Sequence, residues 1–394
     1  MLRIMLRMML RTMQKTIQRT IQRMMQKLSG VFRTYASFIF LFLLIANDLS
    51  AQSRGYKIYD DDPRGEVDLV VCSQNLENYG LFDDAKKRNA KLSKDDYTLK
   101  NKALVKRFAF NKCDVIAFQE LLGNENNSKE AIKKLGKLLA HNTGRVFNYY
   151  LARSNDKYSR VGFLVAKDRA EVLDTVSYSR VELPKLIEGE RPKFFTRGPF
   201  EIQLKVKARG KNKTKKINII TFHFKSKSGG FKDPAKTNWE ILRMQSAEAL
   251  RSIVENRFKK SLIDGEQILI LLGDRNADLD SASARILKGT HTLSMFSGKA
   301  PCRLSKKGVP LCQSGVVRPP VFISVLTDDA ETSRLQGTYM YQNTYSWVDD
   351  ILVAVPSLSF TWENFAVEGN YNSGISDVYP QASDHSLSYV KINF

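Results

Sequence analysis

A continuous apolar run that ends in spaced polar residues constrains the fold of this chain more than any other stretch. Residues 268–278 read Ile-Leu-Ile-Leu-Leu-Gly-Asp-Arg-Asn-Ala-Asp, so Asp274, Asn276 and Asp278 alternate after the apolar residues stop at Gly273. Such a run is typical of a strand that is buried on both faces. The polar side chains at its end either project into a cleft, where they meet a cation or a phosphate, or form an Asx-rich turn.

Comparable apolar runs recur along the chain and alternate with segments of helical periodicity. Strands are expected at residues 69–73, 115–118, 161–166, 200–206, 217–224, 268–272, 351–354 and 386–392, and helices at about 98–111, 128–142 and 235–260. No Pro/Ser-rich linker interrupts this pattern, so we expect one domain over residues 66–394. The alternation predicts the α/β class, with mixed sheets covered by helices.

The first 51 residues differ from the rest of the chain. Residues 1–28 form seven tetrads, each with Arg or Lys at its third position. This pattern indicates low-complexity sequence, with a basic membrane-surface helix as the alternative. Residues 29–51 combine Arg33, an apolar run and small residues before Gln52, which is the pattern of a secretory signal peptide. We expect cleavage after Ala51 and a secreted or periplasmic protein, with an uncleaved membrane anchor as the alternative.

The chain is strongly basic, with a formal net charge of +21. Removing residues 1–51 takes away eight basic residues and one acidic residue and leaves +14. Such a surface attracts polyanions, which include nucleic acid, anionic lipid head groups and acidic glycans, or it serves solubility alone. The expected hairpin turn at residues 205–216 is rich in lysine, and it either adds to a polyanion surface or is a solvated turn.

The four cysteines fall into two pairs of different character. Cys72 and Cys113 lie in apolar, strand-like runs, so we expect small buried hydrophobic side chains there. Cys302 and Cys312 flank a polar loop, and in an exported protein this spacing indicates a disulfide. The sequence has no Cys-x-x-Cys motif, which argues against zinc.

Several other expected strands begin or end with polar side chains of the kind that follow residue 273. These residues are Asn75, Glu120, His223 with Lys225 and Lys227, Asp349 with Asp350, and Asp384 with His385. Each has a structural explanation by itself, as a turn residue, an N-cap, a salt-bridge partner or a buried histidine. Taken together, oxygen ligands without cysteine indicate Mg²⁺, with Mn²⁺ or Ca²⁺ as alternatives. A histidine beside carboxylates indicates a base that activates water, and a cation with lysines would offset charge on a phosphoryl group.

In this order, the residues resemble the endonuclease/exonuclease/phosphatase superfamily. The matching segments are Ser-Gln-Asn at 73–75, Phe-Gln-Glu at 118–120, His-Phe-Lys-Ser-Lys at 223–227, Gly-Asp-Arg-Asn at 273–276, Val-Asp at 348–349 and Ser-Asp-His at 383–385. The stretch His-Phe-Lys-Ser-Lys-Ser-Gly-Gly is similar to one in bacterial secreted nucleases of this superfamily. The resemblance implies a four-layered α/β/β/α sandwich with two mixed β-sheets and a site where the sheets open.

The resemblance also implies roles for the metal ligands and the base. Asn75 and Glu120 would be metal ligands, joined by Asp384. His385 would be the general base, oriented by Asp349 or, as the alternative within the acidic pair, by Asp350.

The remaining implied roles concern the water and the phosphate. Asp274 and Asn276 would position the attacking water and the phosphate, and His223 would contact a phosphate oxygen or stabilise the leaving group. The residues that would lie near the substrate phosphate are Lys225, Arg160 and Tyr158.

This chain departs from the family pattern at two places. Deoxyribonuclease-type members carry a glutamate before the strand at 161–166 that supports the equivalent of His223, and Tyr158-Ser-Arg160 stands there instead. The missing glutamate argues against an acid role for His223. Arg275 replaces a commoner aromatic side chain, and residues 281–346 follow no family pattern.

The leading functional hypothesis is an exported, divalent-metal-dependent phosphodiesterase that hydrolyses DNA, or RNA, with a histidine-activated water. Its partner would be a nucleic acid substrate, and we expect a monomer without an obligate protein partner. The first alternative is a secreted sphingomyelinase, or another phosphodiesterase or phosphatase with the same site. A sphingomyelinase would need an exposed aromatic hairpin for membrane docking, for which Phe194-Phe195 is the candidate. The second alternative is a catalytically silent protein that binds polyanions or a protein partner.

Overall fold

The computed structural model describes residues 67–393, except residue 211 and residues 264–266, 300, 313–314, 329–336, 342–343 and 356–371. These residues belong to one compact unit, Tyr56–Phe394. The tetrad repeat expected at 1–28 and the signal peptide expected at 29–51 lie outside the described residues. Within the described part, no helix combines the length and the apolar character needed to cross a membrane.

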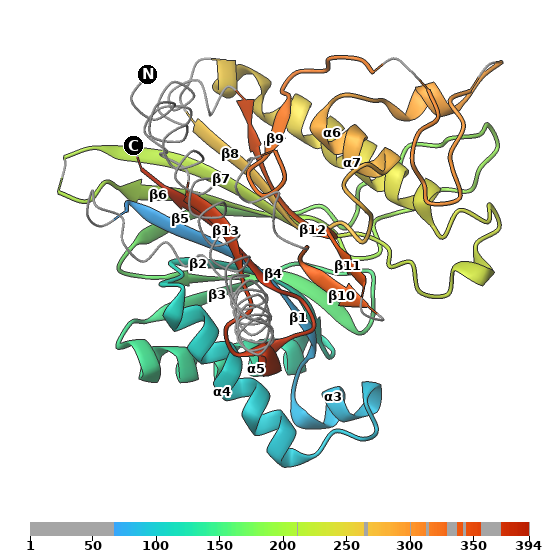
Figure 1. The fold of residues 1–394 in the computed structure, drawn as a ribbon. Helices are drawn as coiled ribbons and strands as arrows, with labels where there is room; N and C mark the ends of the chain where they lie inside the picture. The colour runs from blue at the N-terminus through green and yellow to red at the C-terminus, as the bar shows by residue number, and fades with distance from the viewer. Residues whose placement is uncertain are drawn as a thin grey trace, which may run out of the picture. The chain divides into compact units, whose positions relative to one another are not determined.

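Two six-stranded sheets form the centre of this unit (Figure 1). The first has the order β13 (Asn372–Ser376), β14 (Leu387–Ile392), β1 (Leu69–Tyr79), β2 (Val115–Leu122), β4 (Ser159–Ala166) and β3 (Phe147–Leu151). The second has the order β5 (Ala170–Ser177), β6 (Phe200–Lys207), β7 (Thr214–His223), β8 (Gln267–Asp274), β12 (Asp349–Ala354) and β9 (Phe322–Ser324). Both sheets are mixed, because β1 runs parallel to β2 and β7 parallel to β8, while the other paired strands are antiparallel.

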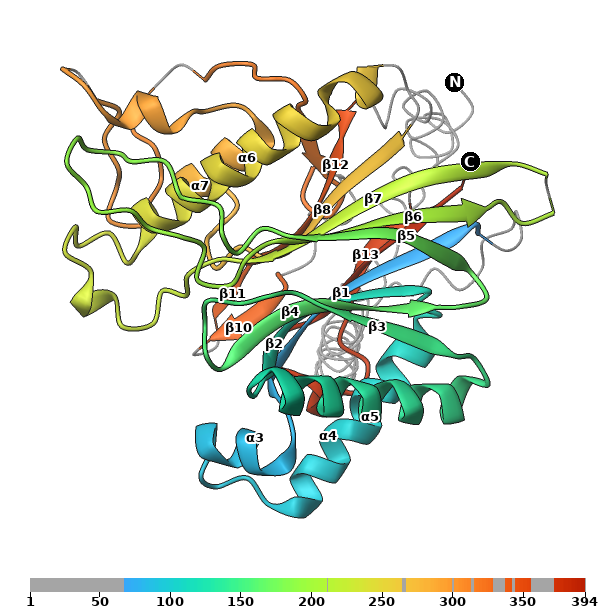
Figure 2. The same cartoon turned by 180° about the vertical axis from the view of Figure 1, so that it is seen from behind.

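Helices cover the outer face of each sheet (Figure 2). The first sheet carries α3 (Phe82–Arg88), α4 (Lys94–Phe110) and α5 (Glu125–Thr143), and the second carries α6 (Glu240–Ile263) and α7 (Ala282–Lys288). Short 3-10 turns occur at Gly230–Lys232, Leu293–Phe296 and Pro380–Ala382, and a small hairpin is formed by β10 (Tyr339–Tyr341) and β11 (Thr344–Ser346). The predicted four-layered α/β/β/α sandwich is confirmed.

The central strand β8 is buried on both faces, as its apolar run predicts. Ile268, Ile270 and Leu272 belong to the core between the two sheets, whereas Leu269 and Leu271 belong to the core under α6. The alternation follows from the two-residue period of a strand. A third core packs α4 and α5 against the first sheet. Burial on both sides fixes the register of β8, and with it the position of the polar residues at its end.

The eight expected strands correspond to the eight interior strands of the two sheets, with ends that shift by up to six residues. The expected hairpin is the antiparallel pair β6–β7. The helix expected at 235–260 begins only at Glu240, because Asp233 accepts hydrogen bonds from the backbone N–H groups of Thr237 and Trp239 at 2.7 and 2.9 Å. These bonds hold the preceding residues in a loop.

Both pairs of cysteines form disulfides, of which one was expected. Cys302 is bonded to Cys312, as predicted. The expected burial of Cys72 and Cys113 is confirmed, at 0% and 3% exposed, but the two side chains are bonded to each other, with a Cα–Cα distance of 5.8 Å, and this disulfide was not expected. The reason is the pairing of β1 with β2, which places Cys72 opposite Ile116 and brings the residues just before β2 alongside it.

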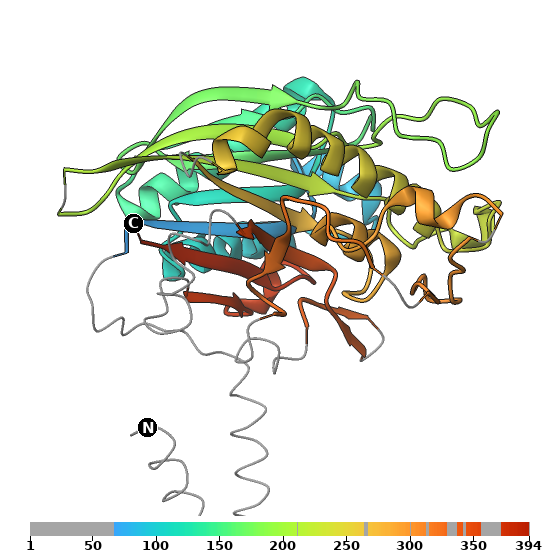
Figure 3. The same ribbon diagram turned by 90° about the horizontal axis from the view of Figure 1, so that it is seen from above.

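The beginning and the end of the described chain lie side by side in the first sheet. Figure 3 shows β1 in blue next to β14 in red. The two strands are antiparallel, with Leu69 opposite Ile392 and Ser73 opposite Ser388. This pairing brings the segment before β14, which carries Asp384 and His385, to the end of β1 that carries Asn75.

Candidate active site

Three of the expected site residues lie in one row across the second sheet. The register pairs His223 at the end of β7 with Asp274 at the end of β8, and Asp274 with Asp349 at the start of β12. Because neighbouring strands lie about 5 Å apart, the sheet alone brings these side chains together. The first sheet adds Asn75 from β1 and Glu120 from β2.

Gly273 lets β8 deliver Asp274 to this row. Its φ angle is +141° and a Cβ atom there would lie 2.0 Å from the carbonyl oxygen of Phe222. An L-residue avoids this backbone region, and the contact leaves no room for a side chain. The glycine that ends the apolar run is therefore required where β8 passes β7.

His385 and Asp349 form a buried pair. The Nδ1 atom of His385 lies 2.8 Å from Oδ2 of Asp349, and both residues are buried. The neighbouring Asp350 points the other way, since successive strand residues face opposite sides, and it pairs with Arg275 and accepts a hydrogen bond from Ser324 Oγ at 2.5 Å. The structure therefore joins His385 to Asp349 rather than to Asp350.

The surroundings of His385 favour its charged form. Burial lowers the pKa of His385, but the charge and hydrogen bond of Asp349, together with the charges of Asp274 and Asp384, outweigh burial and raise the pKa to about 10. The imidazole is therefore protonated at neutral pH unless a positive charge offsets these carboxylates.

Asp274 is the centre of the hydrogen-bond network. It accepts bonds from Asn75 Nδ2 at 3.1 Å, from the backbone N–H of Asn276 at 2.7 Å and from Asn276 Nδ2 at 2.9 Å. Burial and the nearby charges of Asp349 and Glu120 raise the Asp274 pKa to about 7. Asn276 adopts a φ of 55°, which allows both its backbone and its side chain to reach Asp274.

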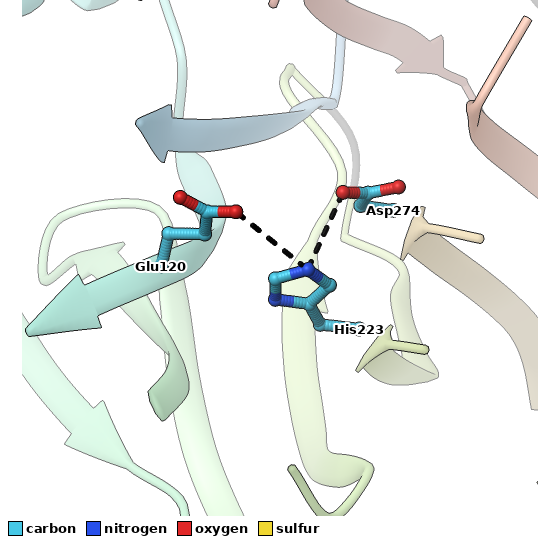
Figure 4. Close-up of side chains that lie close together, drawn as sticks. All are labelled: Glu120, His223 and Asp274. Carbon is cyan, nitrogen blue, oxygen red and sulfur yellow. Dashed lines mark ion pairs between the residues drawn. The ribbon is translucent and has the colours of Figure 1, made fainter. Parts of the chain in front are cut away.

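Glu120 completes the cluster from the opposite sheet. Its φ is 59°, and the β2–β4 register shifts between Phe118 and Leu121. The backbone N–H of Asn78 donates to Glu120 Oε2 at 2.9 Å. Figure 4 shows the His223 ring between Glu120 and Asp274, with Nε2 at 3.8 Å from Glu120 Oε1 and 3.4 Å from Asp274 Oδ2. Glu120 thus faces the second sheet across the opening between the sheets.

This donor set fits a hard divalent cation. Among the residues that the structure describes, two groups have ligand atoms within 4.8 Å of one another: Glu120 with His223 and Asp274, and Asp274 with Asp349 and His385. Asp384 is exposed as a whole residue. Its carboxylate is nevertheless partly desolvated by the groups around it, and this desolvation and the charges of Glu77 and Glu120 raise the pKa of Asp384. Carboxylates held this close repel one another, and a cation among them would relieve the repulsion.

Comparison with known proteins identifies the fold. No family model and no curated protein matches the sequence. ANGEL2, a 2′,3′-cyclic phosphatase solved with adenosine-2′,3′-vanadate, matches with a TM-score of 0.50 and 14% identity over 83% of this chain and 96% of that chain. A humanized D. rerio TDP2 matches with a TM-score of 0.49 and 13% identity over 83% of this chain and 99% of that chain. A Bacteroides thetaiotaomicron endonuclease/exonuclease/phosphatase family protein matches with a TM-score of 0.45 and 14% identity over 82% of this chain and 96% of that chain. The chain has the endonuclease/exonuclease/phosphatase fold.

In this chain, Arg197 determines the tautomer of His223 and lowers the pKa of its imidazole. Arg197 Nη1 lies 3.1 Å from His223 Nε2, and Arg197 Nη2 donates to the Phe224 carbonyl at 3.0 Å. Because a guanidinium only donates, Nε2 accepts and the ring proton is assigned to Nδ1. Burial and then the charge of Arg197 hold the pKa of His223 well below its usual value. A neutral His223 is therefore the stable form here.

Sequence reasoning missed Arg197 and two other residues that shape this site. Arg197 lies in a loop before β6 with no periodic pattern. Arg107, buried in α4, donates from Nη1 to the His385 carbonyl and to Gln74 Oε1, both at 2.9 Å, and so positions the segment that carries His385. The ring of Tyr339 lies 4.6 Å from that of His385, centroid to centroid. These contacts link distant parts of the chain, and no local spacing indicates them.

The three residues expected near the substrate phosphate lie in different surroundings. Lys225 follows β7 next to His223 and lies over the Trp239 ring at 5.2 Å; burial and the charges of Arg197 and Arg243 lower its pKa. In contrast, buried Arg160 donates to Ser128 in α5 at 3.3 Å, and exposed Tyr158 lies under the guanidinium of Arg88 in α3. The contacts found for Arg160 and Tyr158 join them to the helices and not to the carboxylate cluster.

Proposed function

We propose that the protein is an exported, divalent-metal-dependent phosphodiesterase that hydrolyses nucleic acid, primarily DNA, with a water molecule activated by His385. The observation that supports this most strongly is the 2.8 Å contact between His385 and Asp349 beside the Asp274 carboxylate. A base held by one carboxylate and facing others is suited to generating a nucleophile from water. The fold hosts phosphoester chemistry in its relatives, but the assignment here rests on these side chains.

In the proposed reaction, His385 takes the proton of the attacking water at Nε2, since Asp349 engages Nδ1. Asp349 then stabilises the imidazolium. A divalent cation held by Glu120 and Asp274, with Asn75 and Asp384 beside them, would supply positive charge that stabilises the reacting phosphoryl group. Lys225, two residues after His223 and over the Trp239 ring, contributes a further positive charge.

The charge on Arg197 also suits an anionic substrate. Its guanidinium is partly buried against His223 and Phe224, and partial desolvation makes its attraction for a phosphate stronger than in water. The lysine-rich turn between β6 and β7 is too far from the site to contact the reacting phosphate. His223 is nine residues beyond Thr214 in β7, so the turn lies about 30 Å away at roughly 3.3 Å per residue. That turn would hold only a remote part of a long polyanion.

Two observations bear on export and on the membrane alternative. Both pairs of cysteines are disulfide-bonded, which is typical of exported proteins and agrees with the signal peptide expected at 29–51. Phe194 is 47% exposed and Phe195 only 2%, so this pair offers a single exposed ring for docking to a membrane. We therefore favour a nucleic acid over a sphingolipid substrate and keep the proposal of a monomer.

A panel of substrates tests the proposal. The purified protein is incubated with Mg²⁺ and plasmid DNA, RNA, sphingomyelin vesicles or a sugar phosphate. We expect cleavage of DNA, with or without RNA, and only weak release of product from the other two. Hydrolysis of sphingomyelin or of the sugar phosphate without cleavage of either nucleic acid would overturn it.

The pKa of His385 should depend on the metal. Without a cation, we expect its NMR titration near 10 rather than near its usual 6.5, so this interaction stabilises the folded state fully below pH 6.5 and is lost as pH rises toward 10. Added Mg²⁺ should offset the carboxylates and lower the pKa of His385, so the activity measured in Mg²⁺ should rise with pH well below pH 10. A metal-free titration near 6.5 would contradict this description of the site.

A further inference from the structure

The hairpin β10–β11 is tied to both members of the pair His385–Asp349. Thr338, just before β10, accepts a hydrogen bond at Oγ1 from the Asp349 N–H at 3.1 Å, and its carbonyl accepts one from the Ser386 N–H at 2.7 Å. Tyr339 and His385 form an isolated β-bridge. At the hairpin base, a Cβ on Gly337 would lie 2.7 Å from the Ser346 carbonyl oxygen. The hairpin is therefore held beside the reacting groups.

Aromatic rings lead from His385 outward along this hairpin. Tyr339 lies 4.6 Å from His385, and the Tyr339 and Tyr341 rings are 6.4 Å apart and within 13° of parallel. The outer ring of this row is open to solvent, because Tyr341 is 60% exposed. Tyr345, which is 42% exposed, is paired with Met340 and therefore lies on the other face of the hairpin. Most large aromatic side chains bury their rings, so a row of rings that begins at the base and ends in solvent offers free faces to a ligand.

The inner end of the row lies at the site, because the Tyr339 ring contacts His385, whose Nδ1 meets Asp349. The segment 338–346 contains no acidic residue, so the hairpin itself does not repel an anionic chain. A substrate whose phosphate meets the cluster would have its neighbouring groups beside these tyrosines.

We propose that the hairpin β10–β11 is a base-stacking platform, on which a nucleobase next to the scissile phosphate stacks against Tyr341. This inference rests on the proposed nuclease function and names its substrate class. In a duplex, the faces of the bases are covered by their neighbours, so only an unpaired base can offer its face to a protein ring. The preferred substrate is therefore single-stranded nucleic acid. Stacking on aromatic side chains is the usual device for such strands.

The composition of the hairpin favours this occupant over a lipid surface. Met340 is its one exposed aliphatic side chain, at 49%, while Tyr341, Thr344 and Tyr345 all carry hydroxyl groups. Insertion into a membrane gains mainly from apolar area, whereas stacking uses the ring face and tolerates the hydroxyl. The direction of the row, toward His385, also suits a group that is attached to the reacting phosphate.

Steady-state kinetics of Tyr341→Ala test the platform. The substrates are a single-stranded oligonucleotide, the corresponding duplex, and methyl p-nitrophenyl phosphate, which is a phosphodiester without a nucleobase. We expect KM for the single strand to rise about 5- to 100-fold, the range that loss of one stacked base produces, and the single-strand preference over the duplex to shrink. Tyr341→Phe, which keeps the ring, should resemble the wild type. Tyr149→Ala removes a tyrosine of β3 that is also partly exposed and serves as the matched control.

The possible outcomes separate the two proposals. If the wild type hydrolyses methyl p-nitrophenyl phosphate but neither DNA nor RNA, the nuclease function fails and the platform fails with it. If the wild type cleaves nucleic acid and Tyr341→Ala has the wild-type KM for the single strand, the platform is wrong while the nuclease function stands. If Tyr341→Ala weakens binding to sphingomyelin vesicles and leaves oligonucleotide cleavage intact, the hairpin docks membranes and base stacking is overturned.

Discussion

Replacing His385 with alanine is expected to lower kcat about 10²- to 10⁴-fold, the contribution that a well-placed general base makes. The expectation rests on the contact between His385 Nδ1 and Asp349 Oδ2, which fixes the ring and leaves Nε2 to accept the proton of water. KM should change little, because the imidazole acts mainly on the water. Multiple-turnover cleavage of a labelled oligonucleotide measures both constants.

A second histidine provides the matched control for this experiment. His141 is exposed near the end of α5, and we expect His141→Ala to retain wild-type kcat. Circular dichroism and urea unfolding would show that both variants fold. If folded His385→Ala keeps more than roughly a tenth of the wild-type kcat, well above what loss of a general base allows, His385 is not the base.

Replacing Arg275 with methionine should strongly destabilise the protein. Arg275 and Asp350 are both about 1% exposed and form an ion pair, and Arg275 also donates to the carbonyls of Trp347 at 2.8 Å and Ala277 at 3.2 Å. Removing one partner of a buried pair leaves the other charge uncompensated. We expect a loss of about 3–5 kcal/mol in the free energy of unfolding, a large share of the total for a typical protein.

Urea unfolding of a second variant separates this explanation from simple loss of packing. Arg275→Met combined with Asp350→Asn removes both charges, so it should recover part of the lost stability. If Arg275→Met alone unfolds within about 0.5 kcal/mol of the wild type, the range of ordinary surface substitutions, the buried pair does not stabilise the fold. If the double variant is less stable than Arg275→Met, the uncompensated charge is not the cause of the loss.

The same arginine illustrates how far sequence reasoning reaches in this site. The family resemblance implies that the position between Asp274 and Asn276 is commonly aromatic, but it does not reveal why an arginine stands there. The structure supplies the reason, because Arg275 neutralises Asp350 and leaves Asp349 to His385. The sequence could not choose between the two adjacent acids, since the choice depends on which side of β12 each one faces.

The position of a strand in its sheet decides whether it could be predicted from the sequence. The eight expected strands are interior strands, and their apolar residues pack into the cores on one or both faces of the sheets. Within the two six-stranded sheets, the strands that were not expected, β3, β5, β9 and β13, all lie at the edges; the short pair β10–β11 was not expected either. An edge strand such as β5 is mostly exposed or partly exposed, so it carries no apolar run. The short helices α3 and α7 were not expected from the sequence either, because seven residues are too few to show a helical period.

Through-space contacts account for most of what the sequence does not show about the site. The disulfide Cys72–Cys113 depends on the pairing of β1 with β2, and Arg107 and Arg197 reach the site from α4 and from a loop. The site residues at strand ends could be predicted from the sequence, because the end of an apolar run and the polar residue that follows it are both local features. The partners that orient them come from elsewhere in the chain, and only the folded structure brings them together.

The most direct test of the central claim is the metal dependence of DNA cleavage. Supercoiled plasmid and single-stranded circular DNA are each incubated with the purified protein in Mg²⁺, in EDTA, and in EDTA followed by excess Mg²⁺, with His385→Ala alongside. We predict nicking in Mg²⁺, none in EDTA, recovery when Mg²⁺ is restored, and little product from His385→Ala. Undiminished cleavage in EDTA, or no cleavage by the folded wild type in any divalent cation, would contradict a metal-dependent nuclease centred on His385, Asp349 and Asp274.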